Sequence, residues 1–268
     1  MKLPEISIVN QGIWNNPGDF RRTPSRFALC YELEYQRKAC GETTINGVTY
    51  PIKENMLIFT RPGDLRSSAF DVAARAETEF FYFSLDGDAP VPWFDTIPPV
   101  TYADQGLSLQ WQALAATRSD ASEPLQKIDA HLELLRLLTA LSRRGASQAP
   151  AHTEPSPKQR ILFEAIRYMH EHLGESPSLA DIASHIGYSL SHFNHLFKAY
   201  TRHTPHAYYI SLKLEEAKRR LAVTDKSIAV ISDELGFDKT SRFSAAFKKA
   251  YGMTPREFRK AGGVIYNG

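Results

Sequence analysis

The chain has 268 residues, of which 43% are hydrophobic and 23% charged, and this composition excludes a wholly disordered protein. No stretch approaches the roughly 18 consecutive apolar residues of a membrane span, and the N-terminus lacks the apolar core of a signal peptide. We therefore expect a cytoplasmic protein with no membrane partner. Two cysteines, Cys30 and Cys40, are too few for a disulfide framework or a four-ligand zinc site.

The formal net charge of +2 is divided unevenly along the chain. Residues 1–155 carry 15 Lys and Arg against 19 Asp and Glu, whereas residues 156–268 carry 17 against 11. An acidic part joined to a basic part indicates two roles, and a basic domain is typical of proteins that bind polyanions. Because residues 146–157 have the small, polar, proline-containing composition of a linker, we expect one domain over 1–145 and another over 158–262.

The first hundred residues have the pattern of short β-strands separated by turns. Asn46-Gly47 between β-forming residues predicts a two-residue hairpin loop, and the alternation before it predicts a half-buried strand. Trp14 precedes the first clear strand and is expected in an arm. We expect strands over 27–35, 56–59 and 79–85 and a hairpin over 43–50. A series of this kind favours a β-barrel or a sandwich.

Residues 106–144 change to the period of an amphipathic helix. Leucines at 134, 137, 138 and 141 widen its apolar stripe beyond that of a solitary surface helix. Such a helix can pack on the barrel, form a seam between two copies of the chain, or do both, and the sequence leaves these alternatives open. The residues expected in a dimer seam are Leu125, Ile128, Leu132 and Leu135.

The second half contains an internal repeat with a period of about 50 residues. The matching residues are Gly187 with Gly236, Phe193 with Phe243, Phe197 with Phe247, and Thr204-Pro205 with Thr254-Pro255. Each copy predicts a short helix, a glycine turn and a second helix, which is the pattern of a helix-turn-helix motif. Two copies in the basic half of the chain favour DNA binding over a helical bundle with duplicated packing.

Local signals predict how each copy folds. Gly187 and Gly236 are expected to end the first helix in the left-handed conformation. Ser189 and Asp238 are expected to cap the second helix, and residues 178–181 have the outline of a capping box. The paired phenylalanines, four residues apart, hold the second helix against the core and leave its other face outward.

Residues 206–222 predict one helix between the two copies, about 25 Å long. With a turn at each end, the two second helices would lie about 34 Å apart, the length of one turn of DNA. One chain would then contact two successive major grooves. The charged face of the connecting helix is expected to carry Lys213, Lys218, Arg219 and Arg220.

The segment from about Ile161 to Arg259 resembles the DNA-binding domain of the AraC/XylS family of bacterial transcription regulators. The residues that carry the resemblance are Ile228, Ala229, Ile231, Ser232, Leu235, Gly236, Phe237, Phe243, Phe247, Lys248, Lys249, Tyr251, Gly252, Thr254, Pro255, Phe258 and Arg259. The resemblance implies a ligand-responsive regulator of double-stranded DNA, an activator or a repressor. It also implies a homodimer and, for an activator, RNA polymerase as a partner.

In this family the outward face of each second helix contacts bases. The resemblance assigns this role to Ser191, Asn194 and His195 in the first copy and to Thr240, Ser241, Arg242 and Ala245 in the second. The family often has arginine at the positions of His195 and Ala245, so the bidentate guanine contact is missing there unless Arg242 supplies it. The candidate phosphate contacts are Lys198, Arg202, Lys248 and Lys249.

The N-terminal half resembles, more loosely, the cupin-like sensor domain of sugar-responsive members, through Asn46-Gly47 and residues 61–64. The whole chain is therefore expected to be an α+β protein with a cupin-like β-barrel, dimerisation helices and an all-α domain with two helix-turn-helix motifs. Aromatic and polar side chains suit a sugar, although an aromatic acid or another carboxylate fits equally well. The candidate pocket residues are Trp14, Tyr31, Tyr35, Phe59, Arg66, Ser68, Phe80 and Tyr82.

An enzyme is the less favoured hypothesis for the N-terminal half. The first histidine is His131, so the histidine ligands of a metal-dependent cupin are missing from residues 1–130. No nucleophile elbow or phosphate-binding glycine loop is present either. We expect no catalytic residue, metal or cofactor, and the main alternative to a sensor is a barrel that only dimerises or contacts protein.

Overall fold

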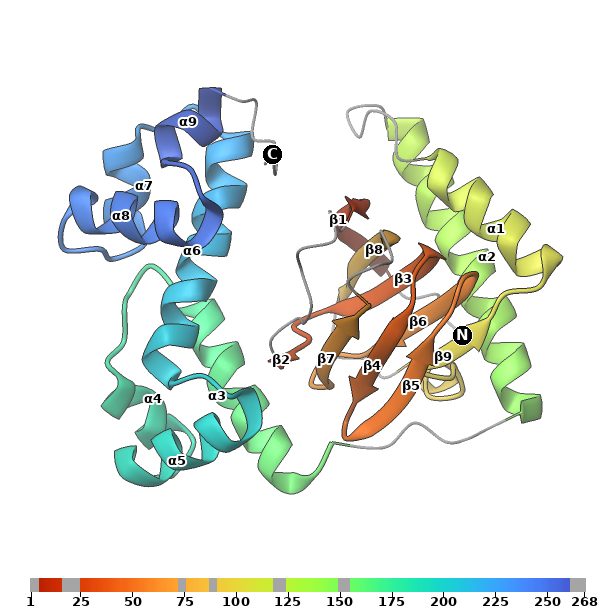
Figure 1. Ribbon diagram of the computed structural model, residues 1–268, viewed down its shortest axis with the longest axis horizontal. Coiled ribbons are helices and arrows are strands. Elements are labelled where there is room, and N and C mark those ends of the chain that lie inside the picture. The colour runs from red at the N-terminus through yellow and green to blue at the C-terminus, as the bar shows by residue number, and fades with distance from the viewer. Residues whose placement is uncertain are drawn as a thin grey trace. The chain divides into compact units, whose positions relative to one another are not determined.

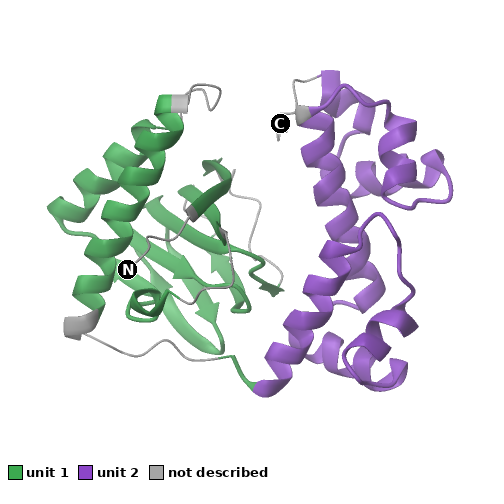
Figure 2. Ribbon diagram, turned by 180° about the vertical axis from the view of Figure 1, so that it is seen from behind, with its two compact units in different colours: residues 1–156 green, residues 157–268 purple. Residues whose placement is uncertain are grey.

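The computed structural model describes residues 5–15, 25–71, 76–86, 91–117, 124–148 and 155–260. The chain divides into two compact units, Met1–Ser156 and Pro157–Gly268, which Figure 2 shows in different colours. The N-terminal unit contains β-sheets covered by helices and the C-terminal unit is helical, so the two-part α+β organisation is as predicted (Figure 1). None of the described helices is long and apolar enough to cross a lipid bilayer.

The described strands of the N-terminal unit form two antiparallel sheets. One has the order β1-β8-β3-β6-β9 and the other the order β2-β7-β4-β5. The bounds are β1 Glu5–Asn15, β2 Arg26–Phe27, β3 Tyr31–Lys38, β4 Gly41–Ile45, β5 Val48–Ile52, β6 Met56–Thr60, β7 Leu65–Phe70, β8 Glu77–Asp86 and β9 Val100–Tyr102. Among these strands the two sheets remain separate, so the expected closed barrel is not formed.

Two turns that the sequence predicted are confirmed. Asn46 and Gly47 have φ angles of 50° and 87° and form the two-residue loop between β4 and β5, in which Ile45 pairs with Val48. β6 ends at the predicted turn, where Gly63 has a φ of 89° and the Asp64 amide donates to the Arg61 carbonyl. In both places a residue that tolerates positive φ stands where the backbone requires it.

The strand predicted over 27–35 is wrong in its bounds and in its exposure. The chain leaves β2 at Phe27 and enters β3, in the other sheet, at Tyr31. Glu32 and Glu34 were expected on a solvated face, but both are buried, with 2% and 7% of their surface exposed. The reason is that β3 is central in its sheet and faces the second sheet on one side and helices on the other, so both of its faces are covered.

Trp14 lies in a strand rather than in an arm. It is part of β1, which pairs with β8 along its length and places Trp14 opposite Thr78. The sequence gives little sign of this strand because its apolar residues alternate irregularly with Ser, Asn, Gln and Gly. A register shift between Ile8 and Asn10 interrupts the period further.

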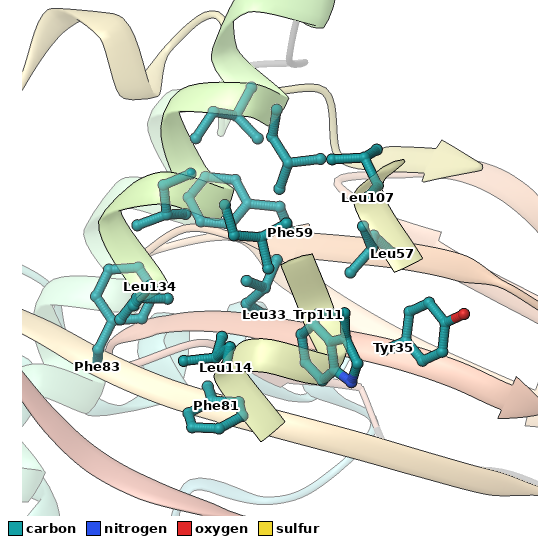
Figure 3. Close-up of a cluster of buried hydrophobic side chains, with 14 of the residues drawn as sticks. Leu33, Tyr35, Leu57, Phe59, Phe81, Phe83, Leu107, Trp111, Leu114 and Leu134 are labelled. Carbon is teal, nitrogen blue, oxygen red and sulfur yellow. The ribbon is translucent and has the colours of Figure 1, made fainter. Parts of the chain in front are cut away.

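Two helices, α1 Gln105–Ala116 and α2 Pro124–Gln148, replace the single helical segment expected over 106–144 and pack on the outer face of the five-stranded sheet (Figure 1). A short 3-10 helix, η1 Pro92–Phe94, contributes Phe94 to the same core. α2 extends to Gln148 and thus takes in the first three residues of the expected linker; residues 149–154 lie outside the described part. The core beneath the helices contains Leu33, Leu57, Phe81, Phe83, Trp111, Leu114, Leu134, Leu137, Leu138 and Leu141 (Figure 3).

The C-terminal unit consists of helices in the order that the repeat predicted. Their bounds are α3 Pro157–Glu171, α4 Leu179–His185, α5 Leu190–Thr201, α6 Pro205–Val223, α7 Ile228–Glu234, α8 Thr240–Tyr251 and α9 Pro255–Lys260. We call α4–α5 the first repeat and α7–α8 the second repeat. The repeats pack near opposite ends of α6, which runs between them (Figure 1).

The turn of each repeat has the geometry that its glycine predicted. Gly187 and Gly236 have φ angles of 72° and 65°, in the left-handed region. The capping box of α4, formed by Ser178 and Asp181, is confirmed, and the Ser189 side chain caps α5 by accepting from the His192 amide. The paired phenylalanines of α5 and α8 are all fully buried: Phe193, Phe197, Phe243 and Phe247.

Asp238 does not cap α8. The residue at the cap is Lys239, which makes no side-chain cap hydrogen bond, because the second turn is one residue longer than the first. The Asp238 carboxylate instead lies 2.6 Å from Nη1 of Arg242, one helical turn further on. Because of the extra residue, the Asp238 carboxylate pairs with the Arg242 side chain on the outward face and does not cap the end of the helix.

Candidate functional site

The outward face of α5 presents the polar side chains that the first repeat was expected to use. Ser191 and His195 are exposed, and Asn194 is half-buried. The Asn194 amide nitrogen donates to the Leu190 carbonyl at 2.9 Å. This bond joins the side chain to the backbone of its own helix, one turn earlier.

The outward face of α8 differs from that of α5. Thr240, Ser241 and Ala245 are exposed, and Arg242 lies on the same side of the helix, three residues before Ala245. Because Asp238 pairs with Arg242, the guanidinium is held beside the first turn of α8. Ala245 carries only a methyl group. Arg242 places a positive charge on this face about one turn closer to the start of the helix.

Basic side chains lie near the ends of both outward helices. Lys198, Lys248 and Lys249 are exposed in the last turns of α5 and α8. Arg202 is also exposed and ends α5 in the left-handed conformation, with a φ of 63°. Both outward helices therefore end in exposed positive charges.

The connecting helix α6 sets the distance between the repeats. Its 19 residues correspond to about 28 Å at 1.5 Å per residue. Lys213 was expected on its charged face, but this side chain is buried and only 4% exposed. Its ammonium lies where the loop between α3 and α4 meets the turn of the second repeat.

A pocket of about 270 Å³ lies between the two sheets of the N-terminal unit. Five of the predicted pocket residues line it, from β1, β7 and β8: Trp14, Arg66, Ser68, Phe80 and Tyr82. Four lining residues were not predicted: Arg26, Glu34, Phe70 and Thr78. Aromatic rings therefore form one part of the wall and hydrogen-bonding groups another.

Three of the predicted pocket residues do not line this pocket. Tyr31, Tyr35 and Phe59 face the helices, in the core that Figure 3 shows. The Tyr35 ring stacks on Trp111 at 5.3 Å between centroids, and its hydroxyl donates to Asn55 Oδ1 at 2.6 Å. Because side chains alternate along a strand, the odd positions of β3 point toward the helices and the even positions toward the pocket.

The charged groups of the pocket are arranged in pairs. Arg66 donates to both oxygens of Glu34 at 2.6 Å, and Arg26 donates to both oxygens of Glu32 at 2.5 and 2.8 Å. Tyr82 donates to Glu34 at 3.1 Å. These two pairs contain as many positive charges as negative ones, and all but Arg26, whose side chain is 39% exposed, are buried.

These contacts decide the protonation states. Burial acts to raise the pKa of Glu34, but the charge and hydrogen bonds of Arg66 outweigh it and hold the pKa below its ordinary value. Burial, together with the charges of Glu34 and Glu32, raises the pKa of Tyr82 well above its ordinary value. Glu34 is therefore an anion and Tyr82 a neutral donor at neutral pH.

No group of three or more potential metal ligands occurs among the described residues.

The row of α2 that was expected to form a dimer seam lies largely outside the core. Leu125, Ile128 and Leu132 are 67%, 54% and 49% exposed, and Leu135 is partly buried against the core. The neighbouring row, which contains Leu134 and its partners, covers the sheet. α2 thus has one apolar row packed within the unit and a second row facing outward.

Comparison with known proteins identifies relatives of both the repeats and the whole chain. A family model described as a helix-turn-helix domain matches residues 182–261. The uncharacterized HTH-type transcriptional regulator YisR of Bacillus subtilis is 32% identical over 113 residues, which are 42% of this chain and 39% of that protein. A putative AraC-like transcription regulator of Streptomyces antibioticus is 26% identical over 249 residues, 88% of this chain and 76% of that protein.

The crystal structure of unsaturated fatty acid bound ToxT from Vibrio cholerae aligns with a TM-score of 0.53 at 11% identity and covers 100% of both chains. At this identity the likeness concerns the fold alone. The matched region covers about a third to a half of the length of several curated relatives, among them YisR. The similarity of sequence to these relatives is thus confined to part of each protein.

Proposed function

Since the chain belongs to the AraC/XylS family, we propose that it is a sequence-specific DNA-binding transcription regulator that contacts two successive major grooves with α5 and α8. The observation that carries the proposal is the presence of two outward helices near opposite ends of α6, a helix about 28 Å long. This length is close to the roughly 34 Å between successive major grooves on one face of DNA.

The side chains on the outward faces suggest different tasks for the two helices. On α5, Asn194 would contact adenine, with Ser191 and His195 beside it. On α8, Arg242 would supply the guanine contact that Ala245 cannot make, with Thr240 and Ser241 contacting neighbouring groups. The remaining candidates would bind phosphates: Lys198, Arg202, Lys248 and Lys249.

The first experiment is a titration of the purified chain with DNA from upstream of its own gene and of neighbouring operons, with random DNA as competitor, at two salt concentrations. We expect competitor-resistant binding whose affinity falls steeply with salt, because phosphate contacts release counterions. Binding no stronger than that to random DNA in every fragment would contradict the proposal. The variant Arg242→Ala should weaken the specific complex and leave binding to random DNA nearly unchanged.

We also propose that the pocket between the sheets binds a neutral, hydroxyl-rich effector such as a sugar. Two paired guanidinium–carboxylate groups offer donors and acceptors without net charge, and the rings of Trp14, Phe80 and Tyr82 offer faces for stacking. A carboxylate effector, such as the fatty acid in ToxT, would have to compete with Glu34 for Arg66. Calorimetric titration with a panel of sugars and organic acids tests this choice, and heat from acids alone would exclude a neutral effector.

The alternative is an N-terminal unit that only dimerises. The outward row of α2 favours dimerisation in either case, because three large apolar side chains are exposed side by side. The two alternatives predict different effects of Phe80→Ala, which widens the pocket. In a sensor, this variant would change how DNA binding responds to an effector. In a unit that only dimerises, neither the variant nor the panel of sugars and acids would change DNA binding.

A further inference from the structure

A buried lysine lies where the loop between α3 and α4 contacts the turn of the second repeat. Lys213 projects from the middle of α6, and its ammonium donates to Ser176 Oγ at 2.8 Å. The same ammonium lies 4.7 Å from the centre of the Tyr209 ring and 5.7 Å from that of Phe237. Ser176 belongs to the loop that precedes the first repeat, and Phe237 to the turn of the second.

Gly236 brings that loop and that turn together. A methyl group added at Gly236 would lie 1.7 Å from Ser176 Oγ and 2.8 Å from Ser176 Cβ. At Gly187, the equivalent position of the first repeat, an added methyl group would meet nothing within 4 Å. The close approach is thus a property of the second turn and not of the motif in general.

Further contacts extend this region along the same loop. The Tyr209 hydroxyl of α6 donates to the His172 carbonyl at 3.2 Å. A methyl group added at Gly174 would lie 3.2 Å from the Glu234 carbonyl at the end of α7. Burial lowers the pKa of the Lys213 ammonium, so holding a charge there costs free energy that the surrounding groups must offset. We call Ser176, Tyr209, Lys213, Gly236 and Phe237 the α6 junction.

We propose that the α6 junction is a positioning element that fixes the spacing and rotation of α5 relative to α8, and thereby the number of base pairs allowed between the two half-sites of one chain. The inference rests on the proposed DNA binding. α6 alone connects the repeats along the chain, whereas the junction adds contacts from the first repeat's loop to the second repeat's turn. When one outward helix is bound, a rigid connection raises the effective concentration of the other at its own half-site. It does so only when the spacing of the half-sites matches the spacing of the helices.

The test uses the full-length chain and a series of DNA fragments that carry both half-sites of one protomer. One base pair is inserted between them in one fragment and two in another. One extra base pair rotates the second half-site by about 35° and shifts it by about 3.4 Å. We expect the wild type to lose about tenfold in affinity with one inserted pair. The variants Ser176→Gly and Lys213→Ala should lose less than about threefold, with unchanged affinity for an isolated half-site.

Two controls separate the junction from general stability. Lys218→Ala removes a positive charge from the same helix at a side chain that lies over the Tyr251 ring, away from the junction, and should keep the tenfold penalty. Gly187→Ala and Gly236→Ala share the strain of positive φ, but only the second collides with Ser176, so only the second should change the spacing preference. Adding Ser176→Gly to Gly236→Ala removes the collision and should restore part of the affinity.

The outcomes distinguish the two proposals. If the wild type binds none of the fragments better than random DNA, the proposed function fails and the junction hypothesis fails with it. If the wild type binds specifically and the junction variants keep the tenfold spacing penalty, the junction does not position the repeats. Because Ser176 already has a φ of 53°, replacing it with glycine relieves strain, and this variant should fold even if Lys213→Ala does not.

Discussion

The guanidinium of Arg66 and the carboxylate of Glu34 face one another across the space between the two sheets, joined by two hydrogen bonds of 2.6 Å. The residues come from β7 and β3, which belong to different sheets. Both side chains are buried. The pair therefore connects the sheets at the same point at which it lines the pocket.

Removing one member of this pair should destabilise the N-terminal unit more than removing both. Arg66→Leu leaves the Glu34 carboxylate buried without its main partner and should cost about 3–5 kcal/mol in the free energy of unfolding. The double variant Arg66→Leu, Glu34→Leu should recover most of that loss. Urea unfolding of the three proteins measures the difference, and equal losses in the single and double variants would show that the pair is not coupled.

Acid should weaken the same connection. The pKa of Glu34 is lower in the folded chain than its ordinary value of 4.5, so the unfolded chain takes up the proton first as the pH falls. The stabilisation is complete above about pH 4.5 and is lost as the pH falls through the folded-state pKa. Unfolding free energies from pH 7 to pH 3 should fall less steeply in the double variant than in the wild type; parallel curves would assign the acid sensitivity to other carboxyl groups.

Replacing the candidate adenine contact should change specificity rather than overall affinity. Asn194→Ala should cost about 1–3 kcal/mol at the specific site and relax the preference at one base position, with little effect on random DNA. Folding should be unaffected, because the hydrogen bond from this side chain to the Leu190 carbonyl lies within its own helix. Anisotropy titrations on both DNAs measure the effect, and equal losses on the two would argue against base contact.

Replacing a candidate phosphate contact should have the opposite signature. Lys248→Ala should weaken binding to every sequence and reduce the slope of log affinity against log salt by about 0.9. The slope is measured from titrations at several salt concentrations. An unchanged slope would show that the Lys248 ammonium does not neutralise a phosphate in the complex.

A charge in the outward row of α2 should separate the proposed dimer. Leu132→Asp places a carboxylate at the centre of the row, and light scattering should then give the mass of a single chain, provided that the wild type gives twice that mass. Leu109→Asp is the matched control, because Leu109 is 58% exposed on α1 and outside the row. A dimer that persists in Leu132→Asp would place the interface elsewhere.

The sequence predicts those parts of the fold that short-range geometry determines. Asn46-Gly47, Gly187 and Gly236 each occupy a backbone position with positive φ, and a local sequence signal identifies such positions. The buried phenylalanines of the repeats follow in the same way from a helical period. These features depend on residues within about one turn of each other.

The sequence does not predict features that depend on distant segments. Glu34 has the pattern of a solvated residue because alternation within one strand contains no information about a second sheet on its other side. Lys213 has the pattern of a charged helix face, although a loop some 37 residues earlier covers it.

The two outward helices of one chain are not equivalent, since α5 begins with a serine cap and carries Asn194 and His195, whereas α8 begins at Lys239 and carries Arg242 and Ala245. A chain with two different contact surfaces, joined in a fixed order, binds a target that has a direction. With the proposed function, each chain would therefore bind its DNA site in only one orientation. Reversing the site would turn the bound chain around relative to the transcribed gene, although every proposed base contact would be kept.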